Sequence, residues 1–299
     1  MVPPAPPGPA AVAPREAARD DRDRPAGALR AIAPEGSVTS RFLGGGLGAR
    51  PFPDYARLTH REYGHRVGIF RILDVLEQFG VTPTIALDAM TAEFYPWLVR
   101  HLQQRGVTFL AHGIAVTRMI SSAMTEQEER AYIVDSLDRL EEVLGERPRG
   151  WMGPEQGESE RTPALLAELG IDHVCDWPND EQPYPMTVPT GDLLSIPTLH
   201  DLDDSYALVH RNLPLSSWQT MLTDAVDQLI TDGEDTARVL ALTVRPWLTG
   251  QPFRIGVLED LLAHAAATGK VWFATAEEVA DAYRDCTTTT TRPSPALTA

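Results

Sequence analysis

Short apolar runs alternate with amphipathic helical patterns over most of the chain. The apolar runs predict strands at Leu29–Ile32, Thr84–Leu87, Thr108–Ala111, Gly150–Met152, His173–Cys175, Leu193–Ile196, Val239–Val244 and Val271–Ala274. The amphipathic patterns predict helices at Arg66–Phe79, Ala92–Arg105, Glu126–Leu144, Pro163–Leu169, Ser216–Thr231, Ile255–Ala267 and Ala276–Tyr283. Strands separated by helices of this length indicate a parallel sheet, and about seven or eight of them fit a (β/α) barrel. We therefore expect an α/β fold.

The periodic region is bounded by two segments of biased composition. Residues 1–26 are rich in Pro, Ala and paired charges, and residues 285–299 are rich in Thr and Pro, so both are predicted to be disordered tails. A single domain over 27–284 remains between them. Within it, Ser37–Glu62 shows no periodicity and carries three consecutive glycines. We expect it to form a loop, either over the active face or at a subunit contact.

Charge and cysteine content narrow the classes of partner. The formal net charge is -16 and the pI is about 4.9, which leaves no basic face for nucleic acid or an anionic membrane surface. The two cysteines, Cys175 and Cys286, are too few for a disulfide framework and match no zinc spacing. Neither a signal peptide nor an apolar run long enough to span a membrane is evident. We expect a cytoplasmic protein with a small-molecule substrate.

Polar residues follow several of the predicted strands directly. His112 follows the run that ends at Ala111, Asp176 follows the run that ends at Cys175, and Arg245 follows the run that ends at Val244. In a parallel barrel the chemistry lies at the carboxyl ends of the strands. These residues are therefore the first candidates for a functional role.

Several ordered motifs resemble a known family. They are YGHRVGIFRILDVLEQFGVTPTIALDA, AHG, RPRGWMGPEQGESERTPALLAELGIDHVCDWPNDEQPYPM, SIPTLHDLDDS and RPWLTGQPFR, and they lie within residues 60–284. This pattern is similar to the allantoinase-like branch of the NodB-type polysaccharide deacetylase superfamily. The resemblance implies a deformed (β/α) barrel that hydrolyses a carbon–nitrogen bond, and it implies a homo-oligomer.

The chain departs from that family at the metal-binding motifs. Metal-dependent members use an acidic residue after the first strand and a pair of histidines spaced H-x-x-x-H. His112 matches the first histidine, but Val116 occupies the second position, and Glu35 is a poor match for the acidic ligand. Arg245 stands where the family commonly has a histidine before Pro-Trp, and arginine cannot shuttle protons at neutral pH. We expect no cofactor, rather than a divalent metal such as zinc; the resemblance itself is to a branch associated with metal-independent ring opening.

Four residues are the candidates for catalysis. His112 is interpreted as a base at the barrel mouth, with a structural histidine as the alternative. Asp176 orients a catalytic group or binds substrate, or else caps a loop. Glu158 contacts substrate, or else lies on a solvated charged face. Arg245 requires an anionic partner, which is either a protein carboxylate such as Asp176 or an acidic group of the substrate.

A second group is predicted to bind substrate. Trp151, Trp177 and Trp247 form an aromatic wall around a planar ligand, unless they serve packing alone. The other members of the group are Asp180, Gln182 and His200. The glutamates at 126, 128 and 129 are interpreted as dipole-stabilising residues at a helix start.

Three functional hypotheses follow. The first is hydrolysis of a small cyclic amide, imide or N-acyl compound without a firmly held metal. The second is a tailoring enzyme of specialised metabolism, such as a cyclase, dehydratase or isomerase, in which Arg245 anchors a substrate carboxylate. The third is a non-catalytic descendant that binds a small molecule, for which apolar packing would fill the former catalytic positions; Val116 favours it.

Overall fold

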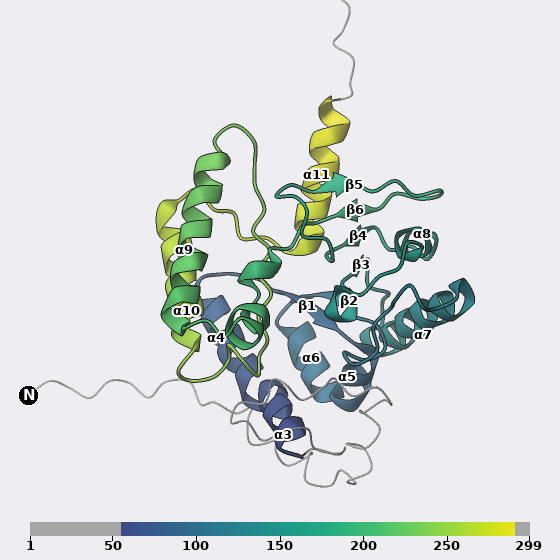
Figure 1. Cartoon of the computed structure of the whole chain (residues 1–299), viewed down its shortest axis with the longest axis horizontal. Helices are drawn as coiled ribbons and strands as arrows, with labels where there is room; N and C mark the ends of the chain where they lie inside the picture. The colour runs from purple at the N-terminus through teal and green to yellow at the C-terminus, as the bar shows by residue number, and fades with distance from the viewer. Residues whose placement is uncertain (1–54, 291–299) are drawn as a thin grey trace, which may run out of the picture.

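The computed structural model describes residues 55–290, in which strands and helices alternate (Figure 1). The strands are β1 (Thr84–Leu87), β2 (Thr108–Ala111), β3 (Gly150–Trp151), β4 (His173–Val174), β5 (Tyr184–Pro185) and β6 (Leu194–Ser195). The α-helices are α3 (Tyr55–Tyr63), α4 (Ile69–Gln78), α5 (Ala89–Phe94), α6 (Pro96–Gln104), α7 (Glu126–Leu144), α8 (Thr162–Glu168), α9 (Leu215–Asp232), α10 (Ile255–Thr268) and α11 (Ala276–Thr290). Two single turns of π-helix lie at η2 (Gly64–Gly68) and η5 (Tyr206–His210), and two turns of 3-10 helix lie at η3 (Pro154–Gln156) and η4 (His200–Leu202).

The strands form one six-stranded sheet in the order β1-β2-β3-β4-β6-β5. The strands β1, β2, β3, β4 and β6 pair in parallel with their neighbours. β5 pairs with β6 as an antiparallel strand at the edge of the sheet. Parallel pairing places the carboxyl ends of β1 to β4 and β6 at one edge. Backbone hydrogen bonds continue past the strand ends there, from His112 N to Leu87 O at 3.0 Å and from Cys175 N to Trp151 O at 2.9 Å. The residues after these strands are therefore held as firmly as the strands.

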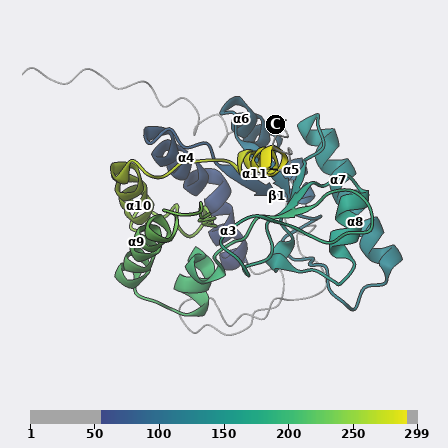
Figure 2. The same ribbon diagram turned by 90° about the horizontal axis from the view of Figure 1, so that it is seen from above.

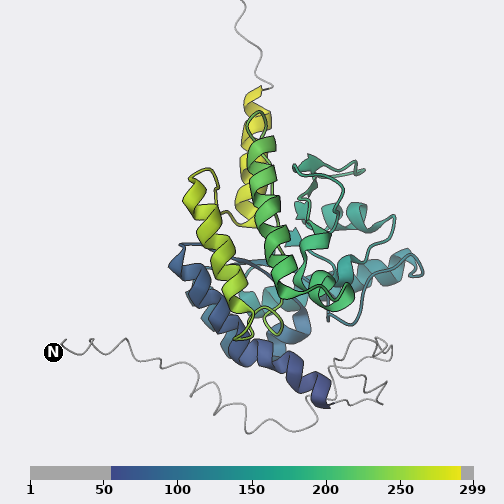
Figure 3. The same cartoon turned by 60° about the vertical axis from the view of Figure 1, so that its left-hand side comes forward.

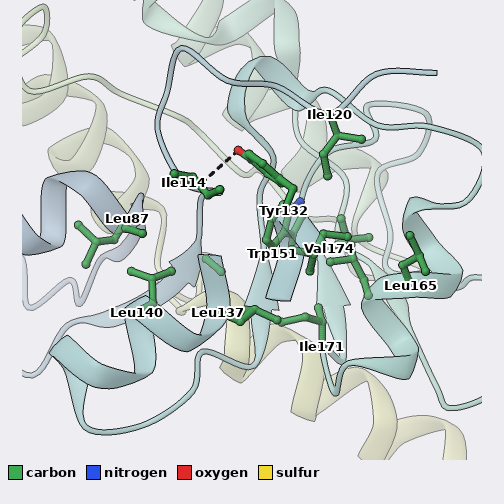
Figure 4. Packing of buried hydrophobic residues seen from close by; sticks show 14 of the residues in the cluster. Leu87, Ile114, Ile120, Tyr132, Leu137, Leu140, Trp151, Leu165, Ile171 and Val174 are labelled. Carbon is green, nitrogen blue, oxygen red and sulfur yellow. Dashed lines mark hydrogen bonds between the residues drawn. The ribbon is translucent and has the colours of Figure 1, made fainter. Parts of the chain in front are cut away.

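Successive side chains of the strands point to opposite faces of the sheet, as pleating requires. On one face, Leu110, Met152 and Cys175 pack with Ala280 of α11. On the other face, Ala111, Trp151 and Val174 pack with residues of α7 and α8 in the largest apolar cluster of the structure (Figure 4). The sheet is thus covered on both faces, which explains why its strands read as continuous apolar runs.

A layer of three helices lies on the opposite side of the molecule from α7 and α8 (Figures 2 and 3). α10 packs against both α4 and α9. The inward face of α9 carries Trp218, Leu222 and Val226, four residues apart, so that they form one stripe. Both this stripe and α10 pack against the apolar side chains of residues 240–244 and 271–273.

The predicted strands Val239–Val244 and Val271–Ala274 are wrong, since the structure forms no strand at either segment. Their side chains are committed to packing on α9 and α10, as the pattern indicated. The sheet edge next to β6 is instead occupied by β5, and the N–H of Val239 donates to Glu181 O at 2.8 Å. The strand predicted at Leu29–Ile32 lies outside the described residues.

Three further boundaries differ from prediction. Residues 55–62 of the segment predicted as a loop form most of α3, and the helix predicted from Arg66 joins α3 through a π-turn at Gly64–Gly68. The helix predicted at Ala92–Arg105 is two helices, α5 and α6, because a proline begins α6. α11 continues to Thr290, into the segment predicted as a tail. The N-terminal tail lies outside the described residues.

No helix within residues 55–290 combines the length and the apolar composition that crossing a membrane requires.

Candidate functional site

His112 and the residues after β3 lie side by side at the carboxyl edge of the sheet. His112 Nδ1 lies 2.5 Å from the carbonyl oxygen of Met152. Because a carbonyl can only accept, Nδ1 carries the ring proton and donates it. Burial, with a smaller contribution from the charge of Arg245, lowers the pKa of His112 to about 4. The imidazole is therefore neutral at pH 7, with a lone pair on Nε2.

Nε2 of His112 has no hydrogen-bond partner recorded among residues 55–290, and the side chain is half-buried. A neutral imidazole with one nitrogen fixed and the other free can accept a proton from water or bind a ligand. The structure therefore gives His112 the tautomer that a general base requires.

Asp176 is buried directly after β4, where it is 3 % exposed. Its two carboxyl oxygens lie 2.8 and 3.0 Å from the backbone N–H of Gly153, which donates to them. Burial first, and the neighbouring Glu158 second, hold the pKa of Asp176 well above its ordinary value. The carboxyl group thus resists ionisation, although a backbone donor favours its charged form.

Glu158 is the second member of this carboxyl pair. Its Oε2 accepts a hydrogen bond from Nε1 of Trp177 at 2.8 Å. Burial raises the pKa of Glu158, and its side chain also interacts with Asp176. Two carboxyl groups this close repel each other when both are ionised, so the pair holds a proton to higher pH than a lone carboxyl group would.

One peptide group joins the histidine to the carboxyl pair. The carbonyl oxygen of the Met152–Gly153 peptide accepts from His112, and the N–H of the same peptide donates to Asp176. Hydrogen bonds in such a chain polarise one another. His112 and Asp176 are therefore held in a fixed relation by the backbone after β3, with Glu158 and Trp177 continuing the chain.

Arg245 has protein carboxylates as its anionic partners. Its Nη1 donates to Oδ1 of Asp203 at 2.5 Å and to Oδ1 of Asp204 at 3.2 Å. Its backbone N–H donates to Oδ2 of Asp204, which also accepts from Thr249. The partner is therefore this aspartate pair and not Asp176. Within residues 55–290 the hydrogen bonds of the side chain come from Nη1 alone, so Nε and Nη2 are the donors that a ligand could use.

The predicted aromatic wall is wrong for Trp151, which is fully buried in the main core among Leu137, Val174 and their neighbours (Figure 4). The pleat of β3 turns this side chain toward α7 and away from any ligand. Trp247 packs beneath the guanidinium of Arg61, 3.7 Å from its ring centre. Trp177 is 36 % exposed and lies at the carboxyl pair. Only Trp177 joins the candidate site.

The remaining predicted substrate-binding residues lie apart from His112. Asp180 accepts hydrogen bonds from the backbone N–H groups of the next two residues, and Gln182 donates to Ala237 O at 2.7 Å. Both line a separate shallow hollow with Leu199 and Arg238. His200 is exposed, with its ring 4.5 Å from that of Tyr206. The Asp180 contacts form a local turn, and the Gln182 contact ties this turn to residue 237.

Known proteins resemble this chain in sequence and in structure. Residues 62–174 match the family "Polysaccharide deacetylase". A relative named "Putative polysaccharide deacetylase" from Schizosaccharomyces pombe is 26 % identical over 240 residues, which cover 74 % of each protein. The solved structure of PuuE allantoinase is 28 % identical with a TM-score of 0.71, covering 77 % of this chain and 76 % of that one. A "probable Polysaccharide deacetylase" from Pseudomonas aeruginosa PAO1 is 27 % identical with the same TM-score, covering 77 % of each chain.

Residues 62–174 thus match the polysaccharide deacetylase family, and the chain resembles deacetylases and an allantoinase over about three quarters of its length. The predicted fold class, a deformed (β/α) barrel of the NodB type, is confirmed by these matches, although the strand ladder within residues 55–290 is open. Deacetylases and allantoinases are hydrolases of carbon–nitrogen bonds, and the superfamily is hydrolytic.

The described part of the superfamily's metal motif does not fit a metal ion. Val116 is 52 % exposed and carries no donor atom at the position of the second histidine. Residues 55–290 contain no group of three or more His, Cys, Asp or Glu side chains that could hold a metal ion. Glu35, the candidate acidic ligand, lies outside the described residues.

Sequence reasoning missed three carboxylates near the site. Asp203 and Asp204 lie within the motif SIPTLHDLDDS. The available signal was that these two adjacent acidic residues could pair with the arginine that follows the apolar segment 239–244. Glu129 was interpreted as a dipole-stabilising residue, but its side chain is 0 % exposed. Nothing in its spacing distinguishes it from the exposed Glu128.

Proposed function

We propose that this protein hydrolyses a carbon–nitrogen bond in a small cyclic amide, imide or N-acyl compound, with His112 as the general base. The observation that carries the proposal is the bond between His112 Nδ1 and Met152 O, which leaves Nε2 neutral and links the histidine through one peptide group to the Asp176–Glu158 pair. Nε2 removes a proton from the attacking water. The nitrogen that leaves the carbonyl carbon takes a proton from the Asp176–Glu158 pair.

Arg245 supplies the third element of this reaction. Attack of water on an amide places negative charge on the carbonyl oxygen, and a fixed cation stabilises that charge. The two aspartates hold the guanidinium in place, and its charge is near enough to His112 to lower the pKa of the imidazole. Arginine remains charged throughout, so it acts here as a stabilising group and not as an acid.

Two observations favour hydrolysis over the alternatives. A tailoring enzyme would use Arg245 to anchor a substrate carboxylate, but Asp203 and Asp204 beside the guanidinium disfavour a further full negative charge, whereas N–H donation to a carbonyl oxygen remains open to it. A binding protein would have apolar packing at the former catalytic positions. Here His112, Asp176 and Glu158 form one polar chain instead.

The test is a screen of cyclic amides, imides and N-acyl compounds with purified protein, in which carbon–nitrogen cleavage is followed by mass spectrometry. His112→Asn is the matched variant, because its amide can still donate to Met152 O but offers no base at the position of Nε2. We expect cleavage by the native protein in the presence of chelator, and a loss of about 100-fold or more in kcat for His112→Asn. Full activity in His112→Asn, or activity abolished by chelator, would overturn the proposal.

A further inference from the structure

Glu129 is a buried carboxylate whose partners all hold one short segment. It lies in the first turn of α7, and its side chain is 0 % exposed. The capping box of this helix is already complete, because Thr125 and Glu128 bond to each other's backbone N–H. Glu129 is therefore free of the capping role that its position suggests.

The carboxylate accepts from three residues of the segment 159–162. Ser159 Oγ donates to Oε2 at 2.7 Å, and Thr162 Oγ1 donates to Oε1 at 2.5 Å. Arg161 donates to Oε2 through Nε at 3.3 Å and Nη2 at 3.1 Å. A buried carboxylate is tolerated only when it is paired and hydrogen-bonded in this way. The bonds fix the backbone immediately after Glu158.

Glu158 stands at the end of this anchored segment. Three groups act on its side chain: Asp176 from the end of β4, the indole N–H of Trp177 and the charge of the Glu129 carboxylate from α7. The Arg161 guanidinium pairs with Glu129. The charge of Glu129 adds to the effect of burial in raising the pKa of Glu158. Glu129 thus acts on Glu158 through both position and charge.

We infer that Glu129 is a positioning residue of the candidate site, which anchors residues 159–162 so that Glu158 is held against Trp177 and Asp176. The inference rests on the proposed function only in so far as Glu158 takes part in the reaction. The position of Glu158 itself can be measured without any substrate, because the indole N–H of Trp177 bonds directly to it.

The experiment records the Trp177 indole resonance in ¹H–¹⁵N spectra of the full chain during a pH titration, with the resonance assigned by Trp177→Phe. Glu129→Gln keeps the shape of the side chain and removes its charge. We expect the titration midpoint sensed by Trp177 to move to lower pH by roughly one unit in this variant, because a negative neighbour has been lost. Glu129→Ala removes the anchor, and we expect the resonance to move toward that of a solvent-exposed indole.

Glu128→Gln is the control, since Glu128 is an exposed carboxylate of the same helix turn that bonds only to Thr125. It should leave the Trp177 resonance and its titration unchanged. If Glu129→Ala does not fold, Thr162→Val, which removes one of the anchoring hydrogen bonds, takes its place. An unchanged Trp177 resonance in the variant that removes the anchor overturns the inference. If the resonance responds as expected but Glu158→Gln keeps full activity, the anchor stands and the proposed role of Glu158 fails.

Discussion

His112 and Asp176 bind opposite ends of the same peptide group, and this arrangement sets the protonation of both. The carbonyl of Met152 selects the tautomer of the histidine, and the N–H of Gly153 holds the carboxyl group. Both contacts are made to backbone atoms of the segment after β3, so neither depends on a side chain of that segment. Their geometry therefore follows from the register of the parallel strands, in which Ala111 pairs with Trp151 and Trp151 pairs with Val174.

Arg245, Asp203 and Asp204 form a second group of charges, whose contribution to the free energy of unfolding can be measured. Asp204 is fully buried, and Arg245 is the cation that offsets its charge and that of Asp203. Arg245→Met leaves two carboxylates in contact without a cation, so we expect the free energy of unfolding to fall by about 3–5 kcal/mol. Denaturant unfolding measures it.

The double variant Arg245→Met with Asp203→Asn removes one of the two charges together with the cation. It should recover part of the loss, because the remaining carboxylate of Asp204 still accepts from Thr249. If the single variant is as stable as the native protein, the guanidinium does not neutralise this pair.

At the scale of elements, the glycine after His112 is required by space as well as by its backbone angle. Gly113 has φ of 68°, and a Cβ atom there would lie 2.2 Å from the hydroxyl oxygen of Tyr132. That hydroxyl donates to Arg118 O and accepts from Ile114 N, so it cannot move without breaking both bonds. The glycine thus lets α7 approach the segment that follows β2.

Gly113→Ala should destabilise the fold by about 3 kcal/mol or more, since left-handed strain and overpacking add. Gly80→Ala is the matched control, because Gly80 has a similar φ of 66° but no atom within 4 Å of its Cβ position. For Gly80→Ala we expect the free energy of unfolding to fall by about 1 kcal/mol, from backbone strain alone. Equal losses of unfolding free energy in thermal or denaturant unfolding would show that crowding at Tyr132 does not matter.

Elements with strong periodicity were predictable, and elements defined by distant pairing were not. The helix α7 was predicted at its observed bounds because an acidic first turn after Thr125 and a terminal glycine mark both ends. The segments 239–244 and 271–274 were apolar enough for strands. Whether an apolar segment joins a ladder depends on which backbone lies beside it, and β5, a two-residue strand ending in proline, gave no such signal.

The residues of the candidate site were predictable only in part. The rule that polar residues follow parallel strands found His112 and Asp176, which the structure places on one peptide, whereas Arg245 was found after a segment that forms no strand. It could not show that Trp151 points into the core, because a strand of two residues has no alternation to read. Nor could it pair Arg245 with Asp203, which lies 42 positions away.

At the scale of the whole molecule, buried groups of opposite kinds give the stability opposite responses to acid. Burial lowers the pKa of His65 to about 4 and raises the pKa of Asp88 to about 6. Between pH 4 and 6.5 the unfolded chain binds more protons than the native protein at His65, so this residue makes the fold less stable as pH falls. Between pH 4 and 6 the native protein binds more protons at Asp88, so the sign is reversed.

Two variants separate these contributions. His65→Leu removes the acid-sensitive term, so its free energy of unfolding relative to the native protein should rise by roughly 2 kcal/mol between about pH 7 and pH 5. Asp88→Asn removes the opposing term, so its relative stability should fall over the same interval. Denaturant melts at both pH values measure the difference. Parallel behaviour of the two variants would contradict the assigned pKa directions.

The measurement that tests the central claim most directly is the pH dependence of kcat/KM for carbon–nitrogen cleavage, with Glu158→Gln alongside. A neutral His112 base predicts an acid limb with a pKa of about 4. The proton held by Asp176 and Glu158 predicts a fall in rate at higher pH, beyond the ordinary carboxyl range, and this limb should change in Glu158→Gln. An acid limb near the ordinary histidine pKa of about 6.5, together with an alkaline limb that Glu158→Gln leaves unchanged, would contradict the account.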